Sequence, residues 1–244
     1  MNVRVFSSEE RKALFEKRPS ASIAGAGEIR GGDYGNVRIL GAGDVAGDVR
    51  AEKLWVCGAG TLHGDLTAAK VKVMGALSVP GHLKVGELAA AGACEIGGRM
   101  LAEDFRVLGV LEGSGGVEAG SFLVRGVVTV RGLLSGDTVE IHLGGGSESC
   151  VGEIGGGRVE VWRFGFGKRS PLAKALGWLS NPASKSYLRA TSIEADDVIL
   201  ENTRAKVVRG KRVVIRSGCT IDEVEYSERL TVHRKSVVGT RTRR

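Results

Sequence analysis

Glycine recurs at every seventeenth position through the first two thirds of this chain, in two separate columns. Glycine fills 38 of 244 positions, so two unbroken columns are not an accident of composition. The columns comprise Gly41, Gly58, Gly75, Gly92, Gly109 and Gly126, and Gly47, Gly64, Gly81, Gly98, Gly115 and Gly132. A short fixed period indicates supersecondary units that cannot bury their apolar faces alone, so we expect the units to stack.

Between the glycines, apolar residues stand at alternate positions. The first and third positions of the 17-residue frame are apolar throughout, from Val37 and Ile39 to Val139 and Ile141, and charged residues such as Arg38 stand between them. Alternation with a period of two is the pattern of a β-strand with one buried and one solvated face. The sequence therefore predicts short strands whose apolar sides point inward.

Each unit is too short for a strand plus a crossover helix, which takes about 30 residues. Its glycines divide it into three strand-length pieces, at corners where the backbone needs positive φ or leaves no room for a Cβ. We predict an all-β fold, a right-handed, three-sided parallel β-helix with 17-residue coils, because parallel crossovers are overwhelmingly right-handed. A left-handed hexapeptide β-helix is the alternative, but 17 is not a multiple of six.

The chain divides into five segments by pattern. Ser7 and Glu10 form a capping box that predicts a short helix running to Lys17, before Pro19. Alternation weakens after Val161 and returns at Leu188. The predicted segments are a partly helical or disordered N-terminal piece (1–24), a main β-helix (25–161), a basic and aromatic insert (162–186), further coils (187–232) and a mobile basic tail (233–244).

Charge is unevenly distributed along the chain, whose formal net charge is +7. Residues 36–157 carry 10 basic and 14 acidic side chains, residues 158–187 carry 6 and 1, and residues 188–244 carry 13 and 8. The positive charge thus gathers in the insert and toward the C-terminus. No apolar run reaches the roughly 20 residues that a membrane span needs, and the N-terminus is charged where a signal peptide is apolar. We expect a cytoplasmic protein.

The insert combines basic and aromatic residues. Ser170 and Pro171 are a suitable N-cap and first residue for a two-turn helix. One interpretation is a linker helix packed on the stack, and the other is a docking element for a membrane or partner. The candidate contact residues are Phe164, Phe166, Lys168, Arg169, Lys174 and Trp178.

Residue types that carry catalysis or bind metal are present without the spacing those tasks require. The four cysteines form no CxxC pair, and Cys94 stands in an inward column, where we expect a small core residue. Asp48, Asp65 and His82 share one column, and we interpret them as turn residues that bond the local backbone. We expect no catalytic site, metal site, cofactor or small-molecule substrate.

These columns, with GEIRGGDYGNVRILGAGDVAGDV near the start and EADDVILENTRAKVVRGKRVVIRSGCTIDEVEYS near the end, resemble the bactofilins, in particular their polymer-forming branch in Gram-positive bacteria. The resemblance covers residues 26–157 and 187–232, and the insert departs from a minimal member of the family. It implies a right-handed β-helix that polymerises end to end without nucleotide, near the cytoplasmic membrane, as a scaffold for envelope-associated processes.

Polymerisation also follows from the stack itself. The end coils of a β-helix have unpaired backbone groups and apolar columns, which form a template for another chain. We expect self-association through Val37 and Ile39 at one end and through Leu230 and Val232 at the other. A two-fold contact gives a filament without polarity and a head-to-tail contact gives a polar one; the resemblance favours the first.

Two further functions remain as alternatives. A β-helix enzyme or binding module that acts on polysaccharide needs clustered carboxylates, for which Asp44, Asp48 and Asp65 are the candidates. The basic tail, with Arg241, Arg243 and Arg244, suits an anionic lipid surface. A nucleic-acid partner is disfavoured because no aromatic residues interleave with these cations.

Overall fold

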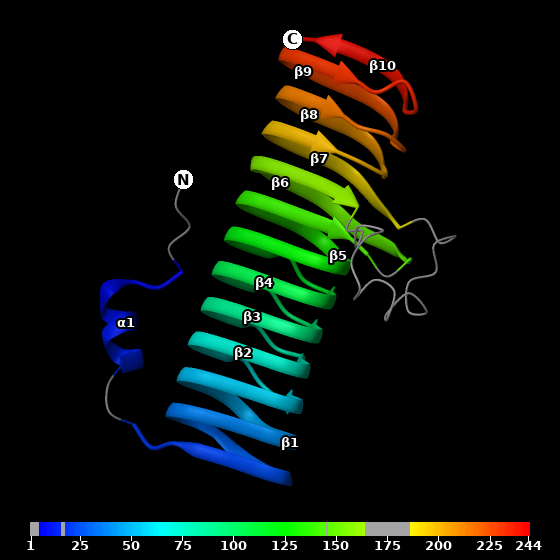
Figure 1. The fold of residues 1–244 in the computed structure, drawn as a ribbon. Helices are drawn as coiled ribbons and strands as arrows, with labels where there is room; N and C mark the ends of the chain where they lie inside the picture. The colour runs from blue at the N-terminus through cyan, green and yellow to red at the C-terminus, as the bar shows by residue number, and fades with distance from the viewer. Residues whose placement is uncertain (1–4, 16–17, 145, 164–185) are drawn as a thin grey trace, which may run out of the picture.

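The chain folds into a single stack of parallel strands that wind around one core (Figure 1). The structure is a computed structural model, and it describes residues 5–15, 18–144, 146–163 and 186–244. Its elements are α1 (Ser8–Phe15), β1 (Ala21–Leu62), β2 (Leu66–Val79), β3 (Leu83–Ile96), β4 (Met100–Gly113), β5 (Val117–Leu143), β6 (Glu148–Arg163), β7 (Tyr187–Leu200), β8 (Thr203–Ile215), β9 (Thr220–Val232) and β10 (Val237–Arg243).

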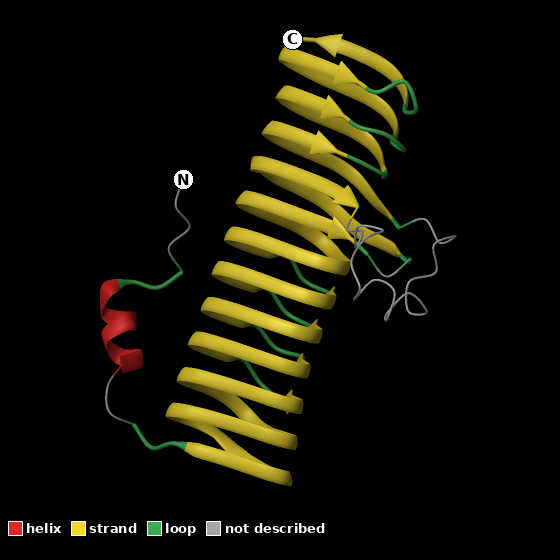
Figure 2. Cartoon of the chain, in the orientation of Figure 1, coloured by secondary structure: helices red, strands yellow, loops and turns green. Residues whose placement is uncertain are grey.

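The ten strands pair in chain order, and every pairing is parallel. Each strand pairs in parallel with the next, and the described connections between them contain no helix, so the chain must wind as a solenoid (Figure 2). The predicted all-β parallel β-helix is therefore confirmed. The stack begins at Ala21, four residues before the expected start, and β6 runs to Arg163.

The pairing register gives the length of each coil directly. From β1 to β5 the partners lie 17 positions apart, as in Val49 with Leu66. The register shifts between Val130 and Leu133, where β5 meets β6, and the partners of β7 and β8 lie 15 positions apart, as in Leu188 with Thr203. β6 and β7, which precede and follow the insert in the sequence, pair with each other in parallel.

The two glycine columns have the structural causes that the sequence predicted. Gly92 has a φ of +135°, and a Cβ there would lie 1.9 Å from the carbonyl oxygen of Gly75 in the preceding coil. In the second column the cause is crowding at the four positions from Gly64 to Gly115 and a φ of +100° at Gly47. A Cβ on Gly98, for example, would lie 2.7 Å from the oxygen of Gly81. Glycine is required where coils pass this close together.

Inward side chains from all coils form one continuous hydrophobic core. Burial alternates along each strand, and the core is filled by ladders of Val, Leu, Ile and Ala. Phe105 and Phe122 are its largest fully buried side chains. Each coil therefore contributes apolar surface that its neighbours cover, as stacking requires.

Helix α1 lies against the side of the stack (Figure 1). It has the predicted capping box: the Glu10 N–H donates to Ser7 Oγ at 3.1 Å, and the Ser7 N–H donates to Glu10 Oε2 at 2.9 Å. The buried side chains of Phe6 and Leu14 attach this segment to the solenoid. The expected end of the helix at Lys17 falls outside the described residues.

Candidate interaction surfaces

The N-terminal end of the stack lies one coil before the predicted end contacts Val37 and Ile39. A Cβ on Gly41 would lie 2.3 Å from the oxygen of Gly25, so residues 21–36 form a coil before Val37 and Ile39. Val37 and Ile39 are 1% and 0% exposed and belong to the core. Their assignment as end contacts was wrong, because the first coil is one position shorter than the repeat and its small, polar composition hides the pattern.

The C-terminal end contains a strand where the sequence predicted a mobile tail. β10 pairs in parallel with β9, from Val237 with Thr220 to Arg243 with Tyr226. The tail prediction was wrong because it relied on apolar alternation. Backbone pairing on an edge strand does not require that alternation, since its outer face can stay in water.

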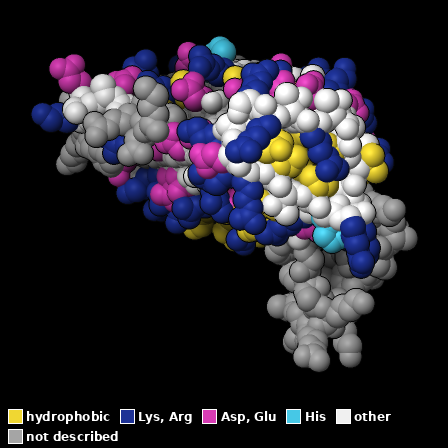
Figure 3. All heavy atoms as spheres, turned by 90° about the horizontal axis from the view of Figure 1, so that it is seen from above, with side chains coloured by type: hydrophobic (Ala, Val, Ile, Leu, Met, Phe, Trp, Pro, Cys, Tyr) yellow, Lys and Arg dark blue, Asp and Glu magenta, His cyan; other side chains and the backbone are white. Residues whose placement is uncertain are grey.

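Leu230 and Val232 do lie at the C-terminal end. β10 covers the first part of β9, and the described part of the chain contains no strand beyond Leu230 and Val232 on the side away from β8. Both side chains are partly buried against the core. Figure 3, which views the stack from this end, shows hydrophobic side chains at its centre within a frame of backbone.

Partly buried apolar residues in contact with the core mark both ends of the solenoid. Ile29 and Tyr34 belong to the first coil. At the other end they are Tyr226, Leu230, Val232 and Val238. The core is thus closed along its length and incompletely covered at both ends, which are the places where another coil would bury more apolar area.

The predicted basic contacts of the tail lie on β10. Arg241 and Arg243 are exposed, and Arg243 Nε donates to the carbonyl oxygen of Ser227 at 3.4 Å. Arg244 forms an ion pair with Glu225 at 2.8 Å. Residues 220–244, which include β9 and β10, carry six basic and four acidic side chains, and the last 16 residues carry no acidic one, so this end of the stack has a net positive charge.

The predicted contacts of the insert lie outside the described residues. These are Phe164, Phe166, Lys168, Arg169, Lys174 and Trp178. The described residues at its two borders, Arg163 and Ser186, belong to neighbouring coils of the stack.

The column that contains Asp48, Asp65 and His82 is a ladder of hydrogen bonds from side chain to backbone. Asp48 Oδ1 accepts from the Asp65 N–H at 2.8 Å, and Asp65 Oδ1 accepts from the His82 N–H at 2.7 Å. His82 Nδ1 accepts from the Arg99 N–H at 2.9 Å. The interpretation of these residues as backbone-bonding residues is confirmed, but the expected local bonds were wrong: each side chain accepts from a backbone N–H 17 positions further on and so joins one coil to the next.

All four cysteines are free thiols. Cys94 is 1% exposed, as predicted for a core residue, and burial raises the pKa of its thiol to about 12. Within the described ranges, no three His, Cys, Asp or Glu side chains gather as metal ligands. None of the helices in these ranges has the length and apolar character that a membrane crossing requires.

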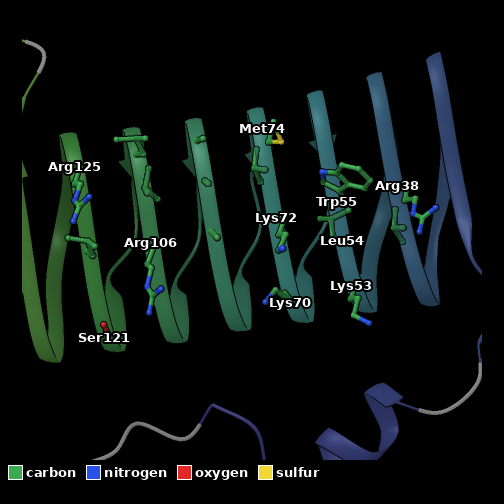
Figure 4. Close-up of a pocket in the computed structure, with 18 of the residues that line it drawn as sticks. Arg38, Lys53, Leu54, Trp55, Lys70, Lys72, Met74, Arg106, Ser121 and Arg125 are labelled. Atoms are coloured by element: carbon green, nitrogen blue, oxygen red, sulfur yellow. The ribbon is translucent and has the colours of Figure 1, made fainter. Parts of the chain in front are cut away.

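The structure also contains a groove that the sequence reasoning missed. It lies on the outer face of coils β1 to β5 and has a volume of about 1220 Å³ (Figure 4). Three apolar side chains are exposed in it: Trp55 (41%), Met74 (58%) and Leu108 (55%). The sequence signal for this groove was the presence of apolar residues at outward positions of the repeat. Those positions were interpreted as polar because Arg38, Lys72 and Arg106 stand there.

Comparisons with known proteins find two Bacillus subtilis (strain 168) relatives. The chain is 36% identical over 114 residues to one described as "uncharacterized protein YhbE", covering 47% of this chain and 44% of the relative. It is 42% identical over 88 residues to "uncharacterized protein YhbF", covering 36% and 32%. The chain thus spans less than half the length of these relatives. No protein family model and no solved structure matches it.

Proposed function

We propose that the chain is a self-assembling cytoskeletal scaffold, of the kind that the bactofilin resemblance implies, and that it polymerises end to end without nucleotide. The observation that supports this proposal is the incomplete covering of the hydrophobic core at the two ends of the solenoid. The core is closed along the solenoid, and partly buried apolar residues touch it at both terminal coils. Stacking one molecule on another would extend the backbone ladder and bury these residues.

The polymer would be cytoplasmic and peripheral to the inner face of the membrane. The cationic C-terminal end supports this location, because each basic residue close to an anionic lipid surface contributes about 1 kcal/mol. Envelope-associated proteins are the partners that such a scaffold would organise. Liposome co-sedimentation of the full chain, with Arg241, Arg243 and Arg244 intact or all replaced by Ser, tests the lipid contact.

Electron microscopy of the purified full chain without nucleotide tests polymerisation. Leu230→Arg places a charge on the C-terminal apolar surface and should shorten or abolish filaments. Leu133→Arg is the matched control, because Leu133 is 49% exposed on the side of the stack. Ile39→Arg is unsuitable, since that side chain is fully buried and the change would unfold the coil.

Circular dichroism of both variants separates loss of assembly from loss of fold. The proposal expects equal β-content in Leu230→Arg and Leu133→Arg, with filaments lost in the first. A chain that stays monomeric at every protein and salt concentration would refute it. Filaments unaffected by Leu230→Arg would place the joining surface away from the C-terminal end.

A further inference from the structure

The groove on the outer face of β1 to β5 owes its depth to two alanines. Ala89 and Ala91 of β3 pair with Lys72 and Met74 on one side and with Arg106 and Leu108 on the other. Long side chains on both neighbouring coils therefore rise above a floor of methyl groups. Neighbouring coils lie about 4.8 Å apart, so these side chains flank a gap of roughly 10 Å along the axis of the solenoid, in the middle of the groove.

The groove continues along the axis of the solenoid. Its lining extends from Asn36, at the end of the first coil in β1, to Glu140 in β5. One outward column crosses it, with one residue in each coil: Arg38, Trp55, Lys72, Ala89, Arg106, Leu123 and Glu140. Six intervals of about 4.8 Å give a length of roughly 29 Å, which is the length of an α-helix of about 19 residues.

The lining is cationic and apolar. Six basic side chains and one acidic side chain line it. Figure 4 shows the basic groups on the coils of β1, β2, β4 and β5, on either side of the β3 alanines: Arg38, Lys53, Lys70, Lys72, Arg106 and Arg125. Lys53, Lys70 and Arg106 have acidic neighbours on the solenoid. Arg38, Lys72 and Arg125 have no acidic partner among the described residues, so their charges are available to a ligand.

Arg125 is held in place without being neutralised. Its Nε donates to His142 Nδ1 at 3.2 Å. Burial and the Arg125 charge lower the pKa of His142, which keeps the imidazole neutral and able to accept this bond. The guanidinium therefore keeps its full charge at the end of the groove.

The solenoid already binds one amphipathic helix on the neighbouring surface. Glu10 of α1 pairs with Lys84 at 2.6 Å, and Arg11 pairs with Glu103 at 2.5 Å. Lys84 and Glu103 stand on successive coils, and the buried Phe6 and Leu14 supply the apolar contact. This solenoid therefore binds a helical segment through ion pairs to two successive coils, together with buried apolar side chains.

We propose that the groove binds an acidic, amphipathic α-helix of a partner protein. The helix pitch of about 5.4 Å is close to the coil spacing, so acidic residues three or four positions apart would meet the cations of β1 and β2 at one end of the groove and those of β4 and β5 at the other. Leucine-sized residues on the same face would pack on Trp55, Met74 and Leu108 above the alanine floor. A planar bilayer would not reach that floor. This inference does not depend on polymerisation.

A synthetic peptide of about five helical turns, long enough to span most of the groove, tests the proposal on the full chain. The probe has Glu and Leu on one face and carries a fluorophore for anisotropy, and a scrambled peptide of the same composition is its control. We expect the amphipathic peptide to bind more tightly than the scrambled one and to gain helical circular dichroism on binding. Equal binding of the two peptides, or none, overturns the proposal.

Variants assign the binding to the groove. Lys72→Glu should weaken peptide binding by about tenfold, as expected for reversing a cation at a contact. Arg131→Glu makes the same charge change at an exposed site outside the groove and should leave binding unchanged. Ala91→Trp fills the floor without changing charge and should also weaken binding. Equal effects of Lys72→Glu and Arg131→Glu overturn the proposal.

Vesicles of phosphatidylcholine and phosphatidylglycerol test the alternative that the groove binds an anionic lipid surface. If they bind the chain, lose binding with Lys72→Glu and keep it with Arg131→Glu, while the peptide fails to bind, the groove is a lipid surface and the proposal is wrong. Microscopy of the same variants separates the two proposals. A variant that loses peptide binding but still forms filaments tests the groove proposal alone. A variant that loses filaments tests the proposal of polymerisation through the ends.

Discussion

Phe105 and Phe122 stack in the core, with ring centroids 5.3 Å apart and ring planes 11° apart. They are register partners, 17 positions apart in sequence, on β4 and β5. The repeat thus places identical side chains directly above each other, which is how a solenoid with few aromatic residues fills a wide part of its core. Coupling between adjacent coils depends on such contacts.

Replacing Phe122 by Ala should destabilise the solenoid by about 3–5 kcal/mol, because it removes a fully buried ring and leaves a cavity beside Phe105. Urea denaturation followed by circular dichroism measures the change. Leu133→Ala is the control, since its side chain is half exposed, and it should cost far less. Equal costs would show that the stacked pair is not a centre of stability.

Gly92→Ala should be more disruptive than its single added methyl group suggests. The methyl would lie 1.9 Å from the Gly75 oxygen, and the residue would have to keep a φ of +135°. Gly155→Ala is the control, because a Cβ there has its nearest neighbour at 3.9 Å and no positive φ is required. We expect a large fall in thermal midpoint for Gly92→Ala and almost none for Gly155→Ala. Similar midpoints would contradict the crowding argument.

The fold could be predicted because identical positions of successive coils contact each other. Apolar residues that recur at one position of the repeat, such as Val71, Leu88 and Phe105, therefore indicate a buried ladder of side chains. The recurring glycines indicate the corners of the coils. The backbone-bonding role of Asp48 and Asp65 followed from the same frame. The repeat carries its own structural information, so no second sequence was needed for these predictions.

The ends could not be predicted by the same reasoning. An end coil has one neighbour, so its residues need not continue the apolar columns. Gly25 to Gly35 contains small and polar residues, and Val237 to Arg243 is mostly exposed, yet both regions pair through backbone groups. Strand pairing that depends on the backbone leaves little trace in side-chain alternation.

The groove was missed for a different reason. Its depth depends on small residues, Ala89 and Ala91, between long ones in the coils on either side. A search for buried columns compares the inward positions of the repeat. It ignores the outward positions, where side-chain size ordinarily varies from coil to coil. Comparing the sizes of Lys72, Ala89 and Arg106 along one outward column would have shown the hollow.

Cys94 should resist thiol reagents in the folded chain. Its side chain is buried, and desolvation raises the pKa of its thiol to about 12, so almost no thiolate forms between pH 7 and 9. Cys150 is exposed and serves as the internal control. Labelling at pH 8 followed by peptide mapping should modify Cys150 within minutes and Cys94 after unfolding in urea. Rapid native labelling of Cys94 would place it outside the core.

Acid should loosen α1 from the solenoid. The pKa of Glu10 is lowered, first because it accepts a hydrogen bond from the Lys84 ammonium and then through the Ser7 N–H. A carboxyl whose folded-state pKa is lowered stabilises the docked helix above its unfolded pKa of about 4.3, and this stabilisation is lost as pH falls through the folded-state value. Hydrogen exchange of residues 8–15, corrected for intrinsic rates, should therefore accelerate below about pH 4.

Glu10→Gln should show faster exchange already at pH 6 and a weaker dependence on acid. Glu9→Gln, at a residue with no ion pair among the described residues, should behave like the unmodified chain. If all three proteins lose protection at the same pH, the Glu10 to Lys84 contact does not hold the helix.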